Sequence, residues 1–343
     1  MHPLNIYRLR KMHLPVIASS VIGIGISYVL TVLYPRDGFE LDDVIIGAVI
    51  GAMIMIIIEI YEIFFAKKIT IKMPPMAAIL INSMIYLVII AIIAYVIIYL
   101  PDNFFHDGSE EIDVLQYMVI LGFCFAAIVL SQFILLLNSF LGKNVLINMM
   151  LGRFHNPQNV KRIFMMLDLK NYTSISERIG DRKALSYLNS FYDDVSSAVV
   201  VCKGDVYRYV GDEVIITWPL RKKTKNSECI KCFFMIKGII EKKSAYYMKH
   251  YGVVPQFRAG LHMGSVVVGQ LGSIKREITY IGDVLNTTSR IEEICKEYNT
   301  DIMVSRDLFE VMDFPETYRI KNEYEMNLRG KQQAINLYSI EKK

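Results

Sequence analysis

Two acidic residues lie where the chain could hold metal ions. Asp168 is the next-to-last residue of the apolar run IFMMLDL (163–169), and Asp212 follows Gly211 in the stretch YRYVGDEVIITW (207–218). Branched and aromatic residues on both sides of Gly211 predict two antiparallel strands joined by a tight turn. Two carboxylates on one sheet edge can bind hard cations such as Mg²⁺, which can activate an attacking oxygen and stabilise a leaving one. Taken alone, the pair is weak support for a metal site, since Asp is also a common turn residue.

The elements that must position these acids form an α+β domain. Residues 174–202 have helical spacing, with capping by Ser174 and Glu177, and a second helical region covers 226–250. Two strands around a turn, a strand that runs into a helix, and a final strand follow, at 257–272, at 278–298 and at the end of the chain. The order is βαββαββαβ-like, which predicts a sandwich with one mixed sheet.

The first 140 residues have a different composition. A mean hydropathy of +0.33 with 53% hydrophobic residues is too apolar for an ordinary soluble protein, and the excess lies in this region. Each of its long apolar runs reaches the roughly 20 residues that a membrane-spanning helix needs. The runs are 14–34, 44–66, 76–100 and 114–138. The sequence therefore predicts a four-helix transmembrane domain (1–140), a short coupling segment (141–162) and a catalytic domain (163–343).

Basic and acidic loops alternate along the membrane region. Arg8, Arg10 and Lys11 precede the first run, and further lysines lie between the second and third. The 35–43 and 101–113 loops carry mainly acids. Because basic loops stay on the cytoplasmic side, both termini are predicted to be cytoplasmic. The protein is thus expected to be a multi-pass protein of the cell inner (plasma) membrane, with the lipid bilayer as a partner.

Two acids lie inside the second apolar run. Glu59 and Glu62 precede Lys67 by one to two helical turns. An acid inside a membrane segment is by default a candidate for function. Here the proximity of Lys67 favours a position near the cytoplasmic interface over a sensing role.

Charge and cysteine usage exclude other classes of function. A formal net charge of +4 gives no support for nucleic-acid binding. Five cysteines, an odd number, fit free thiols in a reducing compartment better than a disulfide framework. Cys229 and Cys232 form the one close pair, and without a partnering histidine cluster we interpret them as thiols on a helix face rather than as a zinc site.

Five stretches, in order, resemble the motifs of the class III nucleotidyl cyclases. They are FMMLDLKNYTSISERIG, YVGDEVIITW, FRAGLHMGSVVVG, YIGDVLNTTSRIEE and LRGKQQAINLY, and together they cover about residues 163–340. The segment GRFHNPQ before them is similar to that of bacterial members with a small membrane anchor. The resemblance implies a cytoplasmic α+β cyclase domain with a ferredoxin-like βαββαβ core.

The resemblance also implies a chemistry. Asp168 and Asp212 would bind two divalent cations, Mg²⁺ or Mn²⁺, with the Leu169 carbonyl as an added ligand. The ribose 3′-oxygen of a nucleoside triphosphate would attack the α-phosphate, which releases pyrophosphate and a 3′,5′-cyclic nucleotide. His262, in a predicted strand, is interpreted as structural, and Glu213 as an exposed turn residue without a role.

Three further residues receive roles from the resemblance. Asn286 would orient the ribose, Arg290 would stabilise charge on the phosphates, and Lys331 would hold the terminal phosphates. The four-residue spacing of Asn286 and Arg290 puts both on one helix face, although an ordinary polar helix face would show the same spacing. In this family the metal-binding acids and the Asn–Arg pair come from different protomers. A homodimer, through the catalytic domain and the membrane helices, is therefore expected.

Base recognition departs from the family pattern. Adenylate-specific members place a Lys three residues before the Gly of the second motif, where this chain has Arg208. Thr279, three residues before the Gly of the asparagine block, matches the Thr-bearing adenylate subgroup. Arg208 could donate to adenine N1 or to guanine O6. The prediction is an adenylate cyclase that uses ATP; the alternatives are a guanylate cyclase, or a membrane receptor or transporter with a non-catalytic nucleotide-binding domain.

Overall fold

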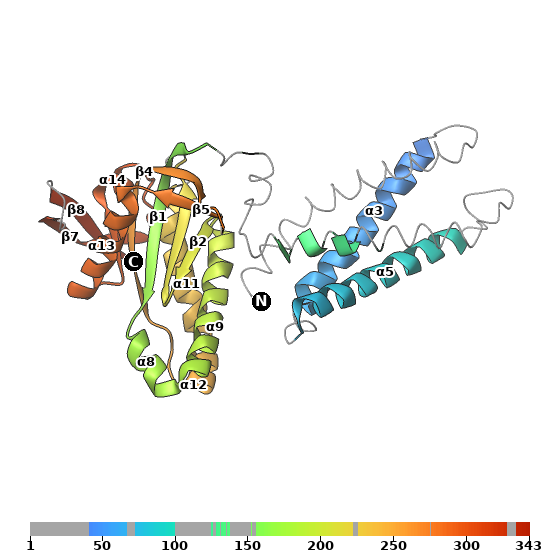
Figure 1. The fold of residues 1–343 in the computed structure, drawn as a ribbon, viewed down its shortest axis with the longest axis horizontal. Helices are drawn as coiled ribbons and strands as arrows, with labels where there is room; N and C mark the ends of the chain where they lie inside the picture. The colour runs from blue at the N-terminus through green and yellow to red at the C-terminus, as the bar shows by residue number, and fades with distance from the viewer. Residues whose placement is uncertain are drawn as a thin grey trace. The chain divides into compact units, whose positions relative to one another are not determined.

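The computed structural model describes residues 41–66, 73–99, 156–221, 226–274, 276–327 and 334–343, with a few positions between 125 and 152. The chain divides into two compact units, Met1–Phe140 and Leu141–Lys343, whose ribbons are drawn in Figure 1.

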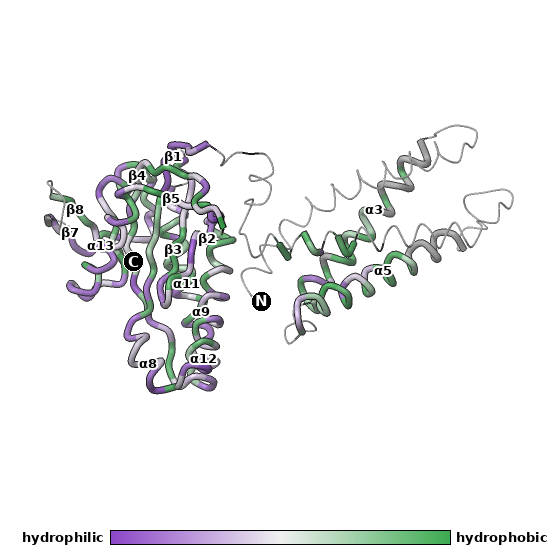
Figure 2. The backbone as a smooth tube through the Cα atoms, in the orientation of Figure 1, coloured by the Kyte–Doolittle hydropathy of each residue, from purple (hydrophilic) through white to green (hydrophobic). Residues whose placement is uncertain are grey.

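The first unit contains two long apolar helices among its described residues. α3 spans Leu41–Tyr61 and continues into a π-helical turn at Glu62–Ala66, and α5 spans Pro75–Tyr99. In Figure 2 the coloured parts of both helices carry many hydrophobic residues, whereas the helices of the second unit mix hydrophilic and hydrophobic residues. Within the described residues, the stretch Pro75–Ile92 is long and apolar enough to cross a membrane.

These helices coincide with two of the predicted membrane crossings. α3 and its π-helical turn fall on the run 44–66, and α5 falls on the run 76–100. The run 14–34 and most of the run 114–138 lie outside the described residues. The four-crossing anchor therefore stays a prediction.

One of the two acids of the second run lies against α5. Glu62 accepts a hydrogen bond from Tyr86, and Tyr61 donates to Asn82 Oδ1 at 2.8 Å. The side chain of Glu59 lies outside the described residues. Glu62 thus has a protein partner within the unit, and its predicted position near the cytoplasmic interface stays a prediction.

The second unit is built on one mixed sheet of eight strands, in the order β2-β3-β1-β4-β6-β8-β7, with β5 paired to β4. The strands are β1 (Gln158–Leu169), β2 (Asp205–Val210), β3 (Glu213–Pro219), β4 (Phe257–Leu271), β5 (Glu277–Ile281), β6 (Ile302–Ser305), β7 (Tyr318–Asn327) and β8 (Ala334–Lys342). β4 and β6 are parallel, and the other pairs are antiparallel. The first four strands and the helices between them give the predicted βαββαβ core.

Helices cover both faces of this sheet (Figure 1). They are α8 (Tyr172–Ile179), α9 (Asp181–Val201), α11 (Glu228–Lys242), α12 (Ser244–Tyr251), α13 (Asp283–Glu297) and α14 (Arg306–Glu310). The larger core lies between the sheet and α8, α9, α11 and α12, and smaller apolar clusters lie on the face that α13 covers.

The central strand β1 is buried on both faces, which explains its uninterrupted apolar run. Ile163, Met165 and Leu167 pack in the larger core, while Phe164 and Met166 pack toward β5 and α13. Side chains alternate between the faces of a strand, so a central strand needs apolar residues at every position. Asp168, two residues beyond Met166, therefore faces the α13 side.

The stretch 257–272 forms a single long strand, β4, so the prediction of two strands around a turn is wrong. Its glycines leave room for the close packing of α13 and do not form a turn. A Cβ at Gly260 would lie 2.5 Å from the backbone nitrogen of Glu292, and one at Gly264 would lie 2.5 Å from Val284 Cγ2. The close approach of a helix, and not a bend in the strand, requires these glycines.

The predicted helix over 174–202 is divided into α8 and α9. Gly180, at φ +79°, separates them, because this left-handed region favours glycine. α8 already begins at Tyr172, after Asn171 at φ +59°. Ser174 is therefore a residue of its first turn, and the predicted capping by Ser174 and Glu177 is wrong.

Candidate active site

The hairpin tip that carries Asp212 is fixed to α9. Val210 pairs with Glu213, so Gly211 and Asp212 form a two-residue turn, and Gly211 has the positive φ (+62°) that such hairpin turns favour. The hydroxyl of Tyr192 donates to the Gly211 carbonyl at 2.7 Å. The predicted turn is confirmed, and its position relative to the helices is set by a side chain that sequence reasoning did not single out.

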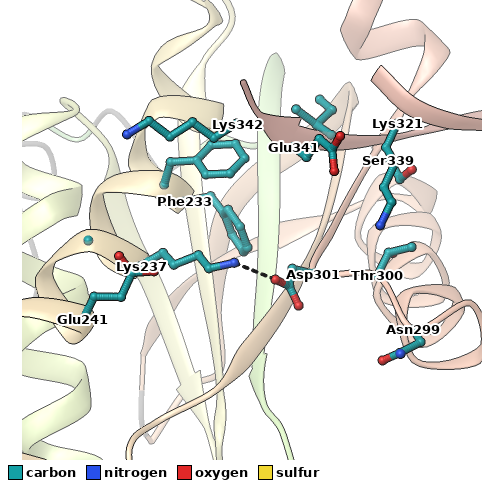
Figure 3. A pocket seen from close by; sticks show the side chains of 13 residues that line it. Phe233, Lys237, Glu241, Asn299, Thr300, Asp301, Lys321, Ser339, Glu341 and Lys342 are labelled. Atoms are coloured by element: carbon teal, nitrogen blue, oxygen red, sulfur yellow. Dashed lines mark hydrogen bonds and ion pairs between the residues drawn. The ribbon is translucent and has the colours of Figure 1, made fainter. Parts of the chain in front are cut away.

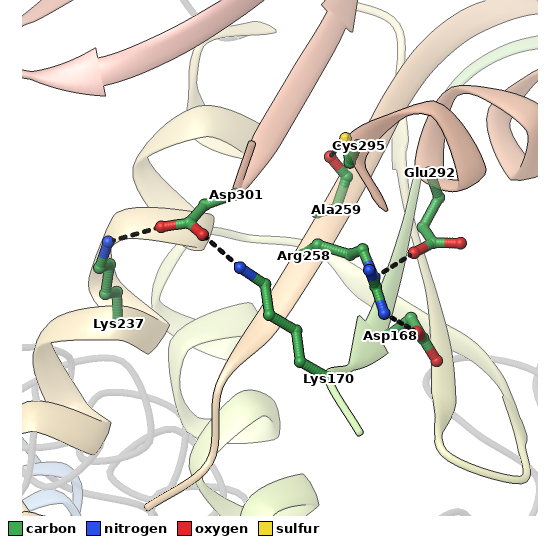
Figure 4. A network of polar contacts seen from close by, with 8 residues as sticks. All are labelled: Asp168, Lys170, Lys237, Arg258, Ala259, Glu292, Cys295 and Asp301. Atoms are coloured by element: carbon green, nitrogen blue, oxygen red, sulfur yellow. Dashed lines mark hydrogen bonds and ion pairs between the residues drawn. The ribbon is translucent and has the colours of Figure 1, made fainter. Parts of the chain in front are cut away.

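Sheet register brings charged residues of three strands together beside Asp168. Glu213 of β3 and Arg258 of β4 lie directly opposite Asp168 on its two sides. Directly opposite residues point to the same face, here the face of α13. Arg258 Nη2 lies 3.3 Å from Asp168 Oδ2, and its Nε lies 2.9 Å from Glu292 Oε1 of α13 (Figure 4). The Nε–H does not point at that oxygen, so the second contact is an ion pair without hydrogen-bond alignment.

Negative charge accumulates in this cluster. Burial, followed by the nearby Asp212 carboxylate, raises the pKa of Asp168 to about 6, although Arg258 opposes the rise. Burial and the two aspartates raise the pKa of Glu213 to about 7. Burial and Asp168 raise the pKa of Glu292 to about 7, again against Arg258. Four carboxyl groups thus face one guanidinium.

Glu213 corrects one prediction. It is half-buried and is the first residue of β3, not an exposed turn residue. Glu213 and Glu292 are site residues that sequence reasoning missed. A signal for Glu213 was its place next to Asp212, whereas Glu292 reaches the cluster only through the packing of α13 on β4.

The donor set around Asp168 fits cations that take oxygen ligands. Leu169, the predicted carbonyl ligand, is the last residue of β1, and its side chain is buried in the larger core. No group of three or more His, Cys, Asp or Glu side chains in the described part of the chain is arranged to hold a metal by itself. Any ion here would need oxygens from the backbone, water or substrate in addition to Asp168 and Asp212.

The predicted base-recognition residues lie on β2 and β5, two strands that are not paired in the sheet but are linked by side-chain contacts. Arg208 of β2 donates from Nη2 to Glu277 Oε2 of β5 at 2.7 Å. The Thr279 hydroxyl lies 3.0 Å from the hydroxyl of Tyr207. The structure thus brings Arg208 and Thr279 to one surface and adds two partners that sequence reasoning missed.

The predicted catalytic pair lies on α13. Asn286 is exposed and Arg290 is half-buried, one helical turn apart, as expected. Among the contacts of the described residues, none links either side chain to Asp168 or Asp212. Lys331 lies outside the described residues.

His262 and the two cysteines Cys229 and Cys232 are buried inside the domain. His262 is buried and lies 2.8 Å from Ser305 Oγ, a contact typical of a structural side chain. Cys229 and Cys232 are free thiols buried in the core, and burial raises the pKa of Cys229 to about 12.

A separate groove of about 450 Å³ lies between α11 and the ends of β6 to β8 (Figure 3). Asp301, in its wall, accepts hydrogen bonds from Lys170 at 2.7 Å and from Lys237 at 2.8 Å. Burial opposes ionisation, but these two lysines hold the pKa of Asp301 below its usual range. None of the predicted site residues lines this groove.

Comparison with known proteins identifies relatives of the second unit. The profile described as "Adenylate and Guanylate cyclase catalytic domain" matches residues 156–342. The chain is 34% identical over 208 residues to adenylate cyclase 2 of Rhizobium meliloti (strain 1021), covering 61% of this chain and 57% of that one. It is 29% identical over 168 residues to guanylate cyclase 2D of Rattus norvegicus, covering 48% and 15%. The chain thus spans less than two thirds of either relative.

A solved structure shares the fold. A bacterial light-regulated adenylyl cyclase matches with a TM-score of 0.53 and 16% identity, covering 68% of this chain and 66% of that one. At this identity the likeness concerns the fold alone.

Proposed function

The chain belongs to the adenylate and guanylate cyclase family, and on that premise we propose that it is an adenylate cyclase. It converts ATP to 3′,5′-cyclic AMP and pyrophosphate, for intracellular signalling. The observation that carries this proposal is the hairpin tip, because Tyr192 holds Gly211 so that Asp212 lies close enough to Asp168 to raise its pKa.

Asp168 and Asp212 bind two divalent cations, Mg²⁺ or Mn²⁺, with the carbonyl of Leu169 as a further ligand. Bound there, such ions supply charge stabilisation for the attacking and leaving oxygens. The excess of carboxyl groups over the one guanidinium of Arg258 supports this role, since divalent cations would neutralise that excess.

The remaining residues position and stabilise the substrate. Asn286 orients the ribose, while Arg290 and Lys331 donate to the phosphate oxygens. The ribose 3′-oxygen bonds to the α-phosphorus as its hydroxyl proton passes to solvent water. The bond from that phosphorus to the bridging oxygen breaks, and pyrophosphate departs with the electron pair.

The wider assembly is part of the same proposal. The apolar stretch Pro75–Ile92 and the alternation of basic and acidic loops support a multi-pass anchor in the plasma membrane, with both termini and the catalytic domain cytoplasmic. Each chain carries both the metal-binding aspartates and the Asn286–Arg290 pair, which supports a homodimer with two equivalent sites. The choice of ATP over GTP rests on Arg208 and Thr279.

Replacing Asp212 by Ala tests the proposal. Full-length protein in membranes is assayed with ATP and GTP in parallel, and nucleotide binding is measured separately. We expect wild type to form cyclic AMP and Asp212→Ala to lose at least about a hundredfold in turnover while still binding nucleotide. Asp313→Ala, at an exposed aspartate outside the site, is the matched control. Unchanged turnover in Asp212→Ala would overturn the proposed role of Asp212. Binding without turnover in wild type would favour a non-catalytic receptor or transporter.

A further inference from the structure

A β-bulge in β2 decides which way Arg208 points. Val206 lies opposite Ile216 and Arg208 lies opposite Ile215, so β2 has one extra residue, Tyr207, at this point. Ile215 and Ile216 are consecutive and face opposite sides of the sheet. The bulge therefore turns Arg208 away from the larger core and onto the face that carries Asp168, as bulges beside active sites often do.

The extra residue and the re-aimed residue each meet a partner on β5. Glu277 and Thr279 are two residues apart in one strand and so share a face. Glu277 accepts from Arg208 at 2.7 Å, and the hydroxyl of Thr279 lies 3.0 Å from that of Tyr207. The Arg208 guanidinium carbon also lies 5.3 Å from the centre of the Tyr207 ring. Arg208 is thus held from two sides.

The ion pair is too exposed to act chiefly on stability. The side chains of Arg208 and Glu277 are 44% and 42% exposed. Pairs at such exposure contribute little to folding, because water screens them and two long side chains lose freedom. The pair does fix the positions of a donor, the Arg208 guanidinium, and an acceptor, the Glu277 carboxylate, near Thr279. A bound base would displace water from both groups.

The two purines make opposite demands on a carboxylate at this place. Guanine presents two neighbouring donors, its N1–H and its 2-amino group, while adenine presents an acceptor at N1 and a donor at its 6-amino group. A carboxylate accepts only, and a guanidinium donates only. A carboxylate open to the base therefore favours guanine, and one engaged by an arginine does not.

We propose that Glu277 is a specificity-determining residue and that Arg208 secures the choice of adenine by occupying its carboxylate. The inference rests on the proposed cyclase function and deepens it. Arg208 does two things at once: it donates toward adenine N1, and it withholds from guanine the acceptor that would recognise it. Removal of Arg208 should therefore convert the site toward GTP, but only while Glu277 is present.

A double-mutant cycle on the full-length protein tests this dependence. Wild type, Arg208→Gln, Glu277→Gln and the double variant are compared by kcat/KM for ATP and GTP. The same four proteins are compared by competitive binding of the α,β-methylene analogues of both nucleotides. Arg208→Gln should raise the GTP-to-ATP ratio at least about tenfold, and the double variant should lose most of that gain. Glu310→Gln, which breaks the exposed Arg306–Glu310 pair, should leave the ratio unchanged.

Measuring binding and turnover separately distinguishes the role of Glu277 in base specificity from the proposed cyclase activity. The same shift in Arg208→Gln with and without Glu277, no shift at all, or a wild type that prefers GTP would each overturn the role of Glu277. Coupled shifts in analogue binding without any turnover would leave that role standing and sink the proposed function. A change of more than a few degrees in Tm for Glu277→Gln would show a structural role instead.

Discussion

Strand register and the packing of α13 gather more carboxyl groups around Asp168 than the single guanidinium of Arg258 can neutralise. The pKa values of Asp168, Glu213 and Glu292 rise to about 6, 7 and 7, from 3.8, 4.5 and 4.5. A raised pKa means that the folded state favours the protonated form. The stabilisation is therefore complete below the ordinary values and is lost as pH rises through the raised ones.

This charge predicts how stability depends on pH and on metal. In EDTA, the Tm of the catalytic unit within the full chain should fall between about pH 5 and about pH 8, as the three carboxyls ionise. Mg²⁺ or Mn²⁺ should raise Tm at the higher pH and have little effect at the lower, because binding needs the ionised form. Differential scanning fluorimetry measures both.

Two variants sharpen the pH experiment. Asp212→Asn should lose the metal-dependent rise, since it removes a proposed ligand. Glu310→Gln, at an exposed carboxyl outside the cluster, should keep both effects. A Tm that climbs steadily with pH in EDTA would contradict the charge distribution described for Asp168.

At the scale of elements, the site depends on how closely α13 lies on β4. Gly260 meets two backbone atoms of the helix, the Glu292 nitrogen at 2.5 Å and the Thr288 oxygen at 2.7 Å. Backbone cannot rotate out of the way as a side chain can, so an added methyl group must displace the helix.

Gly260→Ala should therefore lower both stability and turnover. We expect a loss of about 1–3 kcal/mol in the free energy of unfolding and a larger fall in turnover, because α13 carries Asn286 and Arg290. Gly238→Ala is the matched control: it lies within α11, where a Cβ would meet nothing within 4 Å. That change should stabilise by about 0.5–1 kcal/mol. Equal effects of the two substitutions in denaturant titrations would refute the packing argument.

Local sequence patterns predicted the helices and strands well, but they did not predict the contacts between these elements. The hairpin around Gly211 and the passage from β5 into α13 follow from short-range signals, a Gly-Asp turn and a change of periodicity. The glycines of β4 led to a wrong prediction because the reason for them, the approach of α13, comes from residues that lie about twenty to thirty positions later in the chain. A bulge leaves no mark in the alternation of so short a strand as β2, so the partnership of Arg208 with Glu277 could not be predicted.

The candidate site shows the same division. Asp168 and Asp212 could be predicted from the sequence because one lies at the end of a strand and the other in a turn between two strands. Asn286 and Arg290 could be predicted because their four-residue spacing puts them on one helix face. Glu292 was not, since its place in the cluster depends on tertiary packing against Arg258. Site residues that share one helix or strand can be predicted from the sequence. Site residues that only tertiary packing brings together can be identified only once the fold is known.

At the scale of the whole molecule, the question is whether one chain completes its own site. The proposal places the acids and the Asn286–Arg290 pair of each chain in two different sites of a homodimer. Mixing chains that are defective in opposite halves should then rebuild one intact site per mixed dimer. If each chain formed a self-contained site, mixing could rebuild none.

Co-expression of Asp212→Ala with Arg290→Ala decides between these arrangements. Each variant alone should be nearly inactive, and together they should recover about a quarter of wild-type cyclic AMP formation, since random pairing makes half of the dimers mixed and each mixed dimer has one intact site of two. The pair Asp168→Ala with Asp212→Ala is the control: both changes damage the metal half, so each site of a mixed dimer stays defective. Recovery confined to the first pair, measured in membranes at equal expression, supports the shared site, whereas equal activity of both pairs excludes it.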